Sequence, residues 1–107
     1  MRVLVYIPTT TADGVEIPQA DRLTWVSRGR DMLLKWSSFV VRHEGVVSWS
    51  QGPGDPVWDE PVTILFAECE EKYPAVRAAV TEWCKGVADA LSQGGVMCHI
   101  NDEEVMV

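Results

Sequence analysis

Residues 46–60, VVSWSQGPGDPVWDE, decide the fold, because the centre of this stretch fits neither a helix nor a regular strand. Its Gly-Pro-Gly-Asp-Pro run at positions 52–56 is a strong turn signal, since glycine and proline supply the backbone angles that tight turns need. Apolar segments rich in valine flank the turn at positions 39–49 and 62–67. The pattern therefore predicts two strands joined as an antiparallel hairpin, with one tryptophan on either side of its turn.

One strand and one helix are predicted before this hairpin. Residues 2–7, RVLVYI, alternate β-branched and bulky side chains and stop at a proline, which indicates a strand with two apolar faces. From position 19 to about position 36, apolar residues recur close to the helical period. Gly29 within this segment costs about 1 kcal/mol of helix stability relative to alanine. We still expect a helix there, with a stripe formed by Leu23, Val26, Leu33 and Trp36.

The clearest helix follows the hairpin. Pro74 suits its first turn, and Gly94 and Gly95 end it. Along it runs an apolar stripe at spacings of three and four residues, formed by Val76, Val80, Trp83, Val87 and Leu91. Residues 96–100 then alternate as the last full strand, and residues 104–107 are expected to form a short terminal strand.

The resulting order, β-α-β-β-α-β, has one favoured arrangement. Right-handed crossovers place both helices on the same face of an antiparallel sheet, which is the ferredoxin-like split β-α-β sandwich. The predicted fold class is therefore α+β, with residues 1–107 as a single ferredoxin-like domain and a short extra C-terminal strand.

This fold leaves one face of the sheet without helices. That face would carry Leu4 and Tyr6 of the first strand, with Thr63 and Leu65 or their alternates from the third. An apolar surface of this kind is larger than soluble monomers usually expose. We therefore expect it to be covered, first by a second copy in a homodimer packed sheet to sheet, and next by a different protein or an apolar ligand.

Charge is distributed unevenly along the chain. Six basic and six acidic side chains cancel within residues 1–58, whereas residues 59–107 hold ten acidic and three basic ones and so carry the whole net charge of −7. A negative field repels phosphates and favours basic partners, so we expect no direct nucleic-acid binding. The simpler alternative is that these acids keep a small domain in solution.

The cysteines and apolar runs bear on location. Cys69, Cys84 and Cys98 are odd in number and form no C-x-x-C pair, which argues against a disulfide framework or a common zinc site and favours a reducing cytoplasm. Pro8 cuts the N-terminal apolar run below the length of a signal-peptide core, and nothing approaches the ~20 apolar residues of a membrane span. We expect a cytoplasmic protein that has no membrane contact.

Three stretches together resemble a known group of proteins. They are VYIPTTTADGVEIP at 5–18, GVVSW at 45–49 and WDEPVTILFAE at 58–68, and an alanine-rich amphipathic helix follows them. They are similar to small uncharacterised ferredoxin-like proteins of bacteria, phages and plasmids. The resemblance implies the fold and no activity, because that group offers no functional residues to carry over. The chain departs from it in the Gly-Pro-rich turn and in Gln-Gly-Gly at 93–95, where the group leads us to expect Gln-Glu.

Catalytic pairs are not evident. His43 and Glu44 are adjacent in a predicted strand, where neighbouring side chains point to opposite faces, so they do not easily form one acid–base pair. Cys98 and His99 meet the same difficulty. A cysteine that alternates with apolar residues is more often a small buried hydrophobe than a nucleophile.

Metal and cofactor signals are weaker still. An oxygen-rich metal site of His99, Asp102, Glu103 and Glu104 has no established spacing to support it. The hydroxyl-rich loop at residues 9–11 has one following glycine and no lysine, so it lacks the features of a phosphate-binding loop. We expect no cofactor, no metal and no catalytic residues.

These observations favour a non-enzymatic, acidic protein-interaction module, and the resemblance suggests an inhibitor of a basic nucleic-acid-handling host or defence protein, encoded by a phage or plasmid. Aromatic anchors and an acidic rim would form its interface. The expected interface residues are Trp49, Trp58, Glu68, Glu70, Glu71, Tyr6 and Leu65. The alternative is a dimeric ferredoxin-like barrel that binds a hydrophobic small molecule or haem, with enzymatic activity open to it. Its cavity would be lined by Tyr6, Trp49, Trp58, His43 or His99.

Overall fold

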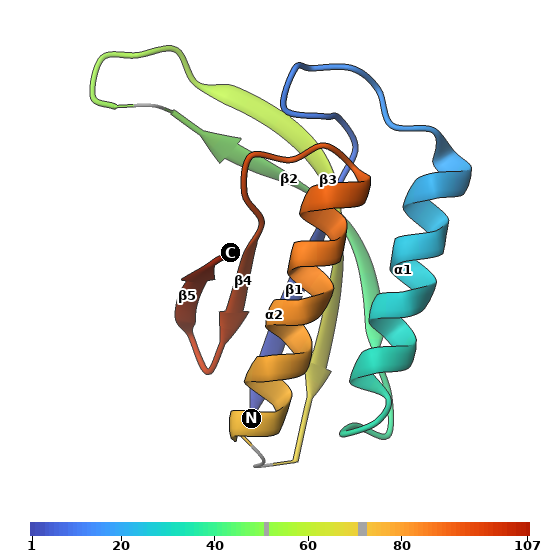
Figure 1. Ribbon diagram of the computed structural model, residues 1–107. Helices are drawn as coiled ribbons and strands as arrows, with labels where there is room; N and C mark the ends of the chain where they lie inside the picture. Colours follow the sequence, from blue (N-terminus) through green and yellow to red (C-terminus); the bar gives the residue numbers. More distant parts are fainter. Residues whose placement is uncertain (51, 71–72) are drawn as a thin grey trace.

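The computed structural model describes residues 1–50, 52–70 and 73–107, and within them the chain forms a five-stranded antiparallel sheet and two helices (Figure 1). The strand order is β2-β3-β1-β4-β5. In chain order the elements are β1 (Arg2–Pro8), α1 (Gln19–Leu33), β2 (Val41–Trp49), β3 (Trp58–Glu68), α2 (Tyr73–Ala90), β4 (Met97–Ile100) and β5 (Glu103–Met106).

Both helices lie on one face of the sheet, and the described part of the chain places no helix on the other face (Figure 1). The predicted α+β class, with an antiparallel sheet and two helices, is confirmed. The terminal strand β5 pairs with β4, beginning one residue earlier than the sequence indicated. No helix in the described ranges is both long enough and apolar enough to cross a membrane.

The central hairpin lies where the sequence predicts it. β2 and β3 pair without interruption as far as Trp49, which lies directly opposite Trp58. The register passes through Gly45 without a shift. The glycine leaves room for Ile64, whose Cδ1 lies 3.0 Å from the position that a Cβ on Gly45 would take.

The core lies between the sheet and the two helices. Alternate residues of β1, β3 and β4 point into it and are almost wholly shielded from solvent, namely Val3, Val5, Ile7, Thr63, Leu65, Ala67, Cys98 and Ile100. The predicted apolar stripe of α2 is buried along its whole length. The four- and three-residue spacing thus identified the face that packs on the sheet.

The two helices interlock through two glycine–tryptophan pairs. A Cβ on Gly29 of α1 would lie 2.9 Å from Cδ1 of Leu65 and 3.0 Å from the ring of Trp83, and a Cβ on Gly86 of α2 would lie 2.6 Å from the ring of Trp25. The two indoles meet edge to face, with ring centroids 6.5 Å apart. Glycine therefore lets each helix approach the other's indole, which offsets the low helix propensity of these residues.

The first helix differs from its prediction. It ends at Leu33 rather than near Trp36, because the Trp36 N–H donates to the Leu33 carbonyl in a tight turn while the Trp36 carbonyl accepts a bond of 2.8 Å from the Glu70 N–H. Leu23, expected in the apolar stripe, is 38% exposed. The buried face of α1 consists of Val26, Gly29, Met32 and Leu33.

Candidate functional site

The helix-free face of the sheet, called the open face below, carries a shallow hollow of about 380 Å³. The strand register builds it, because Leu4 of β1 lies between Phe66 of β3 and His99 of β4, and Tyr6 lies one pleat further along β1. The residues that line the hollow are Arg2, Leu4, Tyr6, Phe66, His99 and Asp102. Its walls thus combine two apolar side chains with ionisable ones.

Tyr6 and His99 form a polar pair within this hollow. The Tyr6 hydroxyl lies 2.8 Å from Nδ1 of His99, and the two rings meet edge to face with centroids 5.7 Å apart. Burial raises the pKa of Tyr6 above its ordinary value, and the nearby charges of Cys98 and Glu104 raise it further. The phenol therefore stays protonated at neutral pH, and which atom of the Tyr6–His99 hydrogen bond is the donor depends on the imidazole tautomer.

Charged groups of both signs border the hollow. Arg2 contacts two carboxylates, with its Nε 3.4 Å from Oε1 of Glu68 and its Nη1 3.8 Å from Oδ1 of Asp102. Glu104 of β5 lies directly opposite His99 of β4. The arrangement can bind a small polar molecule through several charged groups and move a proton at the Tyr6–His99 pair.

The two hairpin tryptophans form a second feature, at the far end of β2 and β3. The rings of Trp49 and Trp58 stack with centroids 6.3 Å apart and an interplanar angle of 26°. Their side chains remain 45% and 56% exposed. The sequence placed them on either side of the turn, and the register brings them together across the ladder.

The expected interface residues do not form one patch. Leu65 is only 1% exposed and packs under the helices, so the prediction that it lies on the open face is wrong. Ile64 and Phe66 occupy that face instead. Glu68 is at the opposite end of β3 from Trp58, about ten residues or ~33 Å of extended strand away. Its carboxylate contacts Arg2 and the N-terminal amine.

Glu70, another acidic position of that expected rim, lies at the same end of β3 as Glu68. Glu70 follows β3, and its backbone N–H bonds to Trp36. Glu71 lies outside the described residues. The described part of the predicted acidic rim, Glu68 and Glu70, is therefore distant from the tryptophans that it was expected to surround.

The adjacent residue pairs that we considered as catalytic candidates point to opposite faces of the sheet, as strand alternation predicted. Cys98 is fully buried in the core, whereas His99 is on the open face. A contact with the Cys84 thiol lowers the pKa of Cys98 and raises the pKa of Cys84, with burial opposing the first shift and adding to the second. The two thiols share one buried environment between α2 and β4.

His43 and Glu44 likewise do not meet in one site. Burial alone would raise the pKa of Glu44, but hydrogen bonds from Thr63 and Arg42 outweigh it and lower this pKa. The Thr63 hydroxyl donates to Glu44 Oε2 at 2.9 Å, and Arg42 Nε lies 3.1 Å from Oε1. Glu44 is therefore a structural carboxylate between β2 and β3.

No group of three or more metal-ligating side chains is assembled within residues 1–50, 52–70 and 73–107. Within these ranges, the metal site considered in the sequence, of His99, Asp102, Glu103 and Glu104, is therefore not assembled. In the loop after β1, the Thr9 and Thr10 hydroxyls donate to the Pro61 carbonyl and the Glu60 carboxylate, so they hold the loop to β3.

Sequence reasoning named Tyr6 and His99 singly as cavity residues and did not pair them. The sequence pattern could have placed both side chains on the same face of the sheet, because Tyr6 and His99 each alternate with apolar residues of their own strand. The pairing also requires β1 and β4 to be neighbours, which the predicted topology implied.

Comparisons with known proteins add one finding. The structure is similar to that of a phage SAM lyase in complex with S-methyl-5′-thioadenosine, with a TM-score of 0.65 and 10% sequence identity over 99% of this chain and 87% of that chain. No protein-family model matches the sequence, and no curated protein matches it.

This likeness establishes a shared fold, and it corrects one prediction. The sequence led us to expect a non-enzymatic protein, whereas the same fold over almost the whole chain is that of an enzyme. The prediction rested on the absence of catalytic residue pairs adjacent in sequence, and such a search does not reach the open-face pair, whose members come from strands at opposite ends of the chain.

Proposed function

We propose that this protein is an enzyme that binds S-adenosylmethionine at the open-face hollow and cleaves it as a lyase. The observation that carries the proposal is the bond of 2.8 Å between the Tyr6 hydroxyl and Nδ1 of His99, set in a hollow with apolar and charged walls. The fold shared with a phage SAM lyase supports the choice of ligand. The proposed ligand differs from the alternative raised by the sequence, a hydrophobic small molecule or haem in a dimeric barrel, because S-adenosylmethionine is charged and polar.

The charge of the protein suits this ligand. S-adenosylmethionine carries a sulfonium, an ammonium and a carboxylate, so it is a net cation at neutral pH, and the protein has a net charge of −7. Arg2 offers a partner for the ligand carboxylate, while Asp102 and Glu104 offer partners for its cationic groups. Leu4 and Phe66 supply apolar surface for the adenosine or the methyl group.

The bond that breaks follows from the named product. S-methyl-5′-thioadenosine keeps the methyl and adenosyl groups, so cleavage separates the sulfur from the amino-acid side chain. The sulfur keeps the bonding electron pair and becomes a neutral thioether. In the same step, the carbon fragment either loses a proton to a base or forms a bond from its own carboxylate to the carbon that the sulfur leaves. We assign His99 to take that proton, and the protonated Tyr6 to orient His99 or the carboxylate.

The test is formation of S-methyl-5′-thioadenosine from S-adenosylmethionine, followed by chromatography. His99→Gln and Tyr6→Phe should lower the rate about a hundredfold or more if the pair takes part in the reaction. His43→Gln is the matched control, because it changes the same residue type on β2, outside the hollow. A purified protein that neither binds nor cleaves S-adenosylmethionine would remove the proposal, and equal losses in the two histidine variants would remove the assignment of His99.

A homodimer packed through the open face is a second proposal. Partly buried apolar residues occupy that face, and Val41 and Met106 near its two edges are 45% and 66% exposed. The order β2-β3-β1-β4, with β5 added at one edge, supports a ferredoxin-like assignment, in which this face is free to pair. Native mass measurement gives the assembly state, and Phe66→Glu should dissociate a dimer of this kind. A monomer in the unaltered protein would end the proposal.

A further inference from the structure

We propose that the hairpin arm, defined as the described residues 46–50 and 52–60, carries a separate docking site at which Trp49 and Trp58 bind an arginine-containing segment of a basic partner protein. The site is independent of the proposed enzymatic function. It lies at the far end of β2 and β3, whereas the hollow is lined from β1, the later part of β3 and β4.

The shape of the arm makes its indoles accessible. The hairpin extends beyond the layer of helices, with its turn at the top of the molecule (Figure 1). Trp49 and Trp58 stack on each other and still expose about half of their surface, and Val57 beside them is 69% exposed. A stacked pair of this kind is rigid, so little side-chain entropy remains to be lost when a partner covers it.

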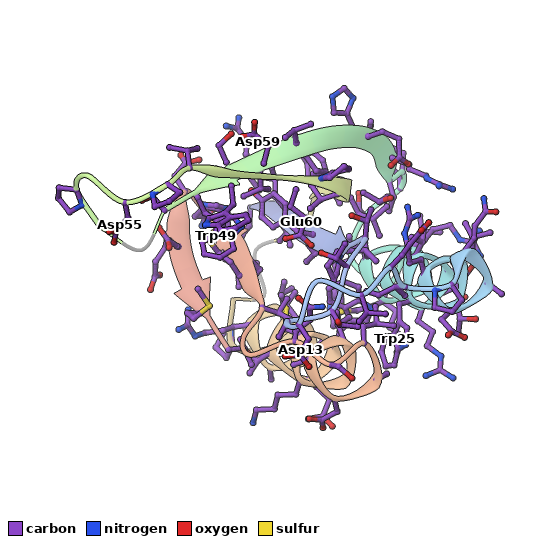
Figure 2. The ribbon with its side chains drawn as sticks, turned by 90° about the horizontal axis from the view of Figure 1, so that it is seen from above. Asp13, Trp25, Trp49, Asp55, Asp59 and Glu60 are labelled. Carbon is purple, nitrogen blue, oxygen red and sulfur yellow. The ribbon has the colours of Figure 1, made fainter. Side chains whose placement is uncertain are left out.

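The charge of the arm is of one sign. From Glu44 to Glu71 the sequence contains seven acidic residues and no lysine or arginine. Three of these acids, Asp55, Asp59 and Glu60, belong to the arm and are labelled with Trp49 in Figure 2. Glu60 lies two residues from Trp58 and therefore on the same face of the ladder as the indoles, whereas Asp59 lies on the opposite face with Ser48.

Two of these carboxylates are held by uncharged donors. The Ser48 hydroxyl lies 2.6 Å from Oδ1 of Asp59, and the Thr10 hydroxyl lies 2.9 Å from Oε1 of Glu60. Hydroxyl donors position a carboxylate without neutralising it, so both negative charges remain available to a cation. The arm is thus a preorganised anionic and aromatic surface.

Arginine fits this combination better than lysine. Its flat guanidinium stacks on an indole while its N–H groups reach carboxylates, whereas the lysine ammonium is a compact and strongly hydrated charge. The chain already contains one such contact, since the Arg28 guanidinium lies 4.8 Å from the ring centroid of Trp25. A nucleic acid would be repelled by the same carboxylates, which leaves a basic protein segment as the occupant.

The test uses fluorescently labelled oligoarginine and oligolysine peptides of equal length, with binding followed by anisotropy. The oligoarginine peptide should bind more tightly, and Trp58→Ala should weaken it about fivefold, in keeping with loss of one cation–π contact of about 1 kcal/mol. Trp58→Phe keeps an aromatic ring and should retain most of the affinity. Circular dichroism of each variant verifies that the fold is intact.

Charge variants separate this site from general attraction to an acidic protein. Glu60→Gln on the arm should weaken oligoarginine binding more than Glu82→Gln, which removes the same charge from an exposed position of α2. Absence of oligoarginine binding would overturn the proposal, and so would equal affinity for the two peptides that Trp58→Ala leaves unchanged. His99→Gln should leave peptide binding intact, so failure of the enzymatic proposal would be distinguishable from failure of this one.

Discussion

Substitution of Gly29 by alanine tests the close approach of the two helices to each other and to the sheet. In a helix interior, alanine is favoured over glycine by about 1 kcal/mol. Against this gain, the new Cβ would lie 2.9 Å from Leu65 Cδ1 and 3.0 Å from the Trp83 ring. Both neighbours are buried, at 1% and 6% exposure, so neither can move aside freely. Overpacking of a core costs about 1–3 kcal/mol, so after the gain of about 1 kcal/mol a net loss of up to about 2 kcal/mol is expected.

Urea denaturation of the unaltered protein and of Gly29→Ala measures this loss directly. A destabilisation of 1 kcal/mol corresponds to a fall in melting temperature of roughly 4–8 °C for a domain near this size. Gly94→Ala is the control, because nothing lies within 4 Å of its added Cβ, and its effect should stay within about 0.5 kcal/mol. A Gly29→Ala protein that is more stable than the unaltered chain by the full helix-propensity gain of about 1 kcal/mol would refute the close packing between α1, α2 and β3.

Three further predictions concern titration and reactivity. Because the pKa of Tyr6 is raised in the fold, the folded state keeps the phenol proton to a higher pH than the unfolded chain does, and the stability of the fold should decrease as the pH rises above about 10. Thermal melts at alkaline pH should show a smaller decrease in melting temperature for Tyr6→Phe than for the unaltered protein. Because the pKa of Glu44 is lowered in the fold, its ionised carboxylate stabilises the folded state above the pKa of the unfolded chain, and this stabilisation is lost as the pH falls. Acid titration followed by circular dichroism should show that the stability of Glu44→Gln depends less on pH than that of the unaltered protein. An equal pH dependence of stability in the two proteins would contradict this. The three cysteines are buried as free thiols, so a thiol reagent should modify them slowly in the native protein and rapidly in denaturant, whereas fast native modification would contradict their burial.

The elements with strong local signals were predictable from the sequence. The stripe of α2 repeats over five positions, and the Gly-Pro-rich turn leaves a hairpin as the natural connection, so both were placed correctly. The first helix was harder, because its packing depends on Gly29, which has no side chain and therefore contributes no apolar signal. Its end is set by a bond from Glu70, 34 positions after Trp36, which no local pattern reveals.

The face assignment of β3 was not decidable from its sequence. Residues 62–67 are apolar on both faces except for Thr63, so alternation could not show that Leu65 points toward the helices and Phe66 away from them. The candidate site was harder still. Tyr6 and His99 are 93 positions apart, and their hydrogen bond depends on the register between β1 and β4.

The most direct test of the proposed site is a nuclear magnetic resonance titration of the protein with S-adenosylmethionine, with the two histidine rings observed separately. Binding at the open-face hollow should shift the ring resonances of His99 and of its partner Tyr6 in a saturable manner and leave those of His43 in place. Shifts that are confined to His43, or no shifts at S-adenosylmethionine concentrations above about 1 mM, the upper end of typical enzyme KM values, would contradict binding at the open-face hollow.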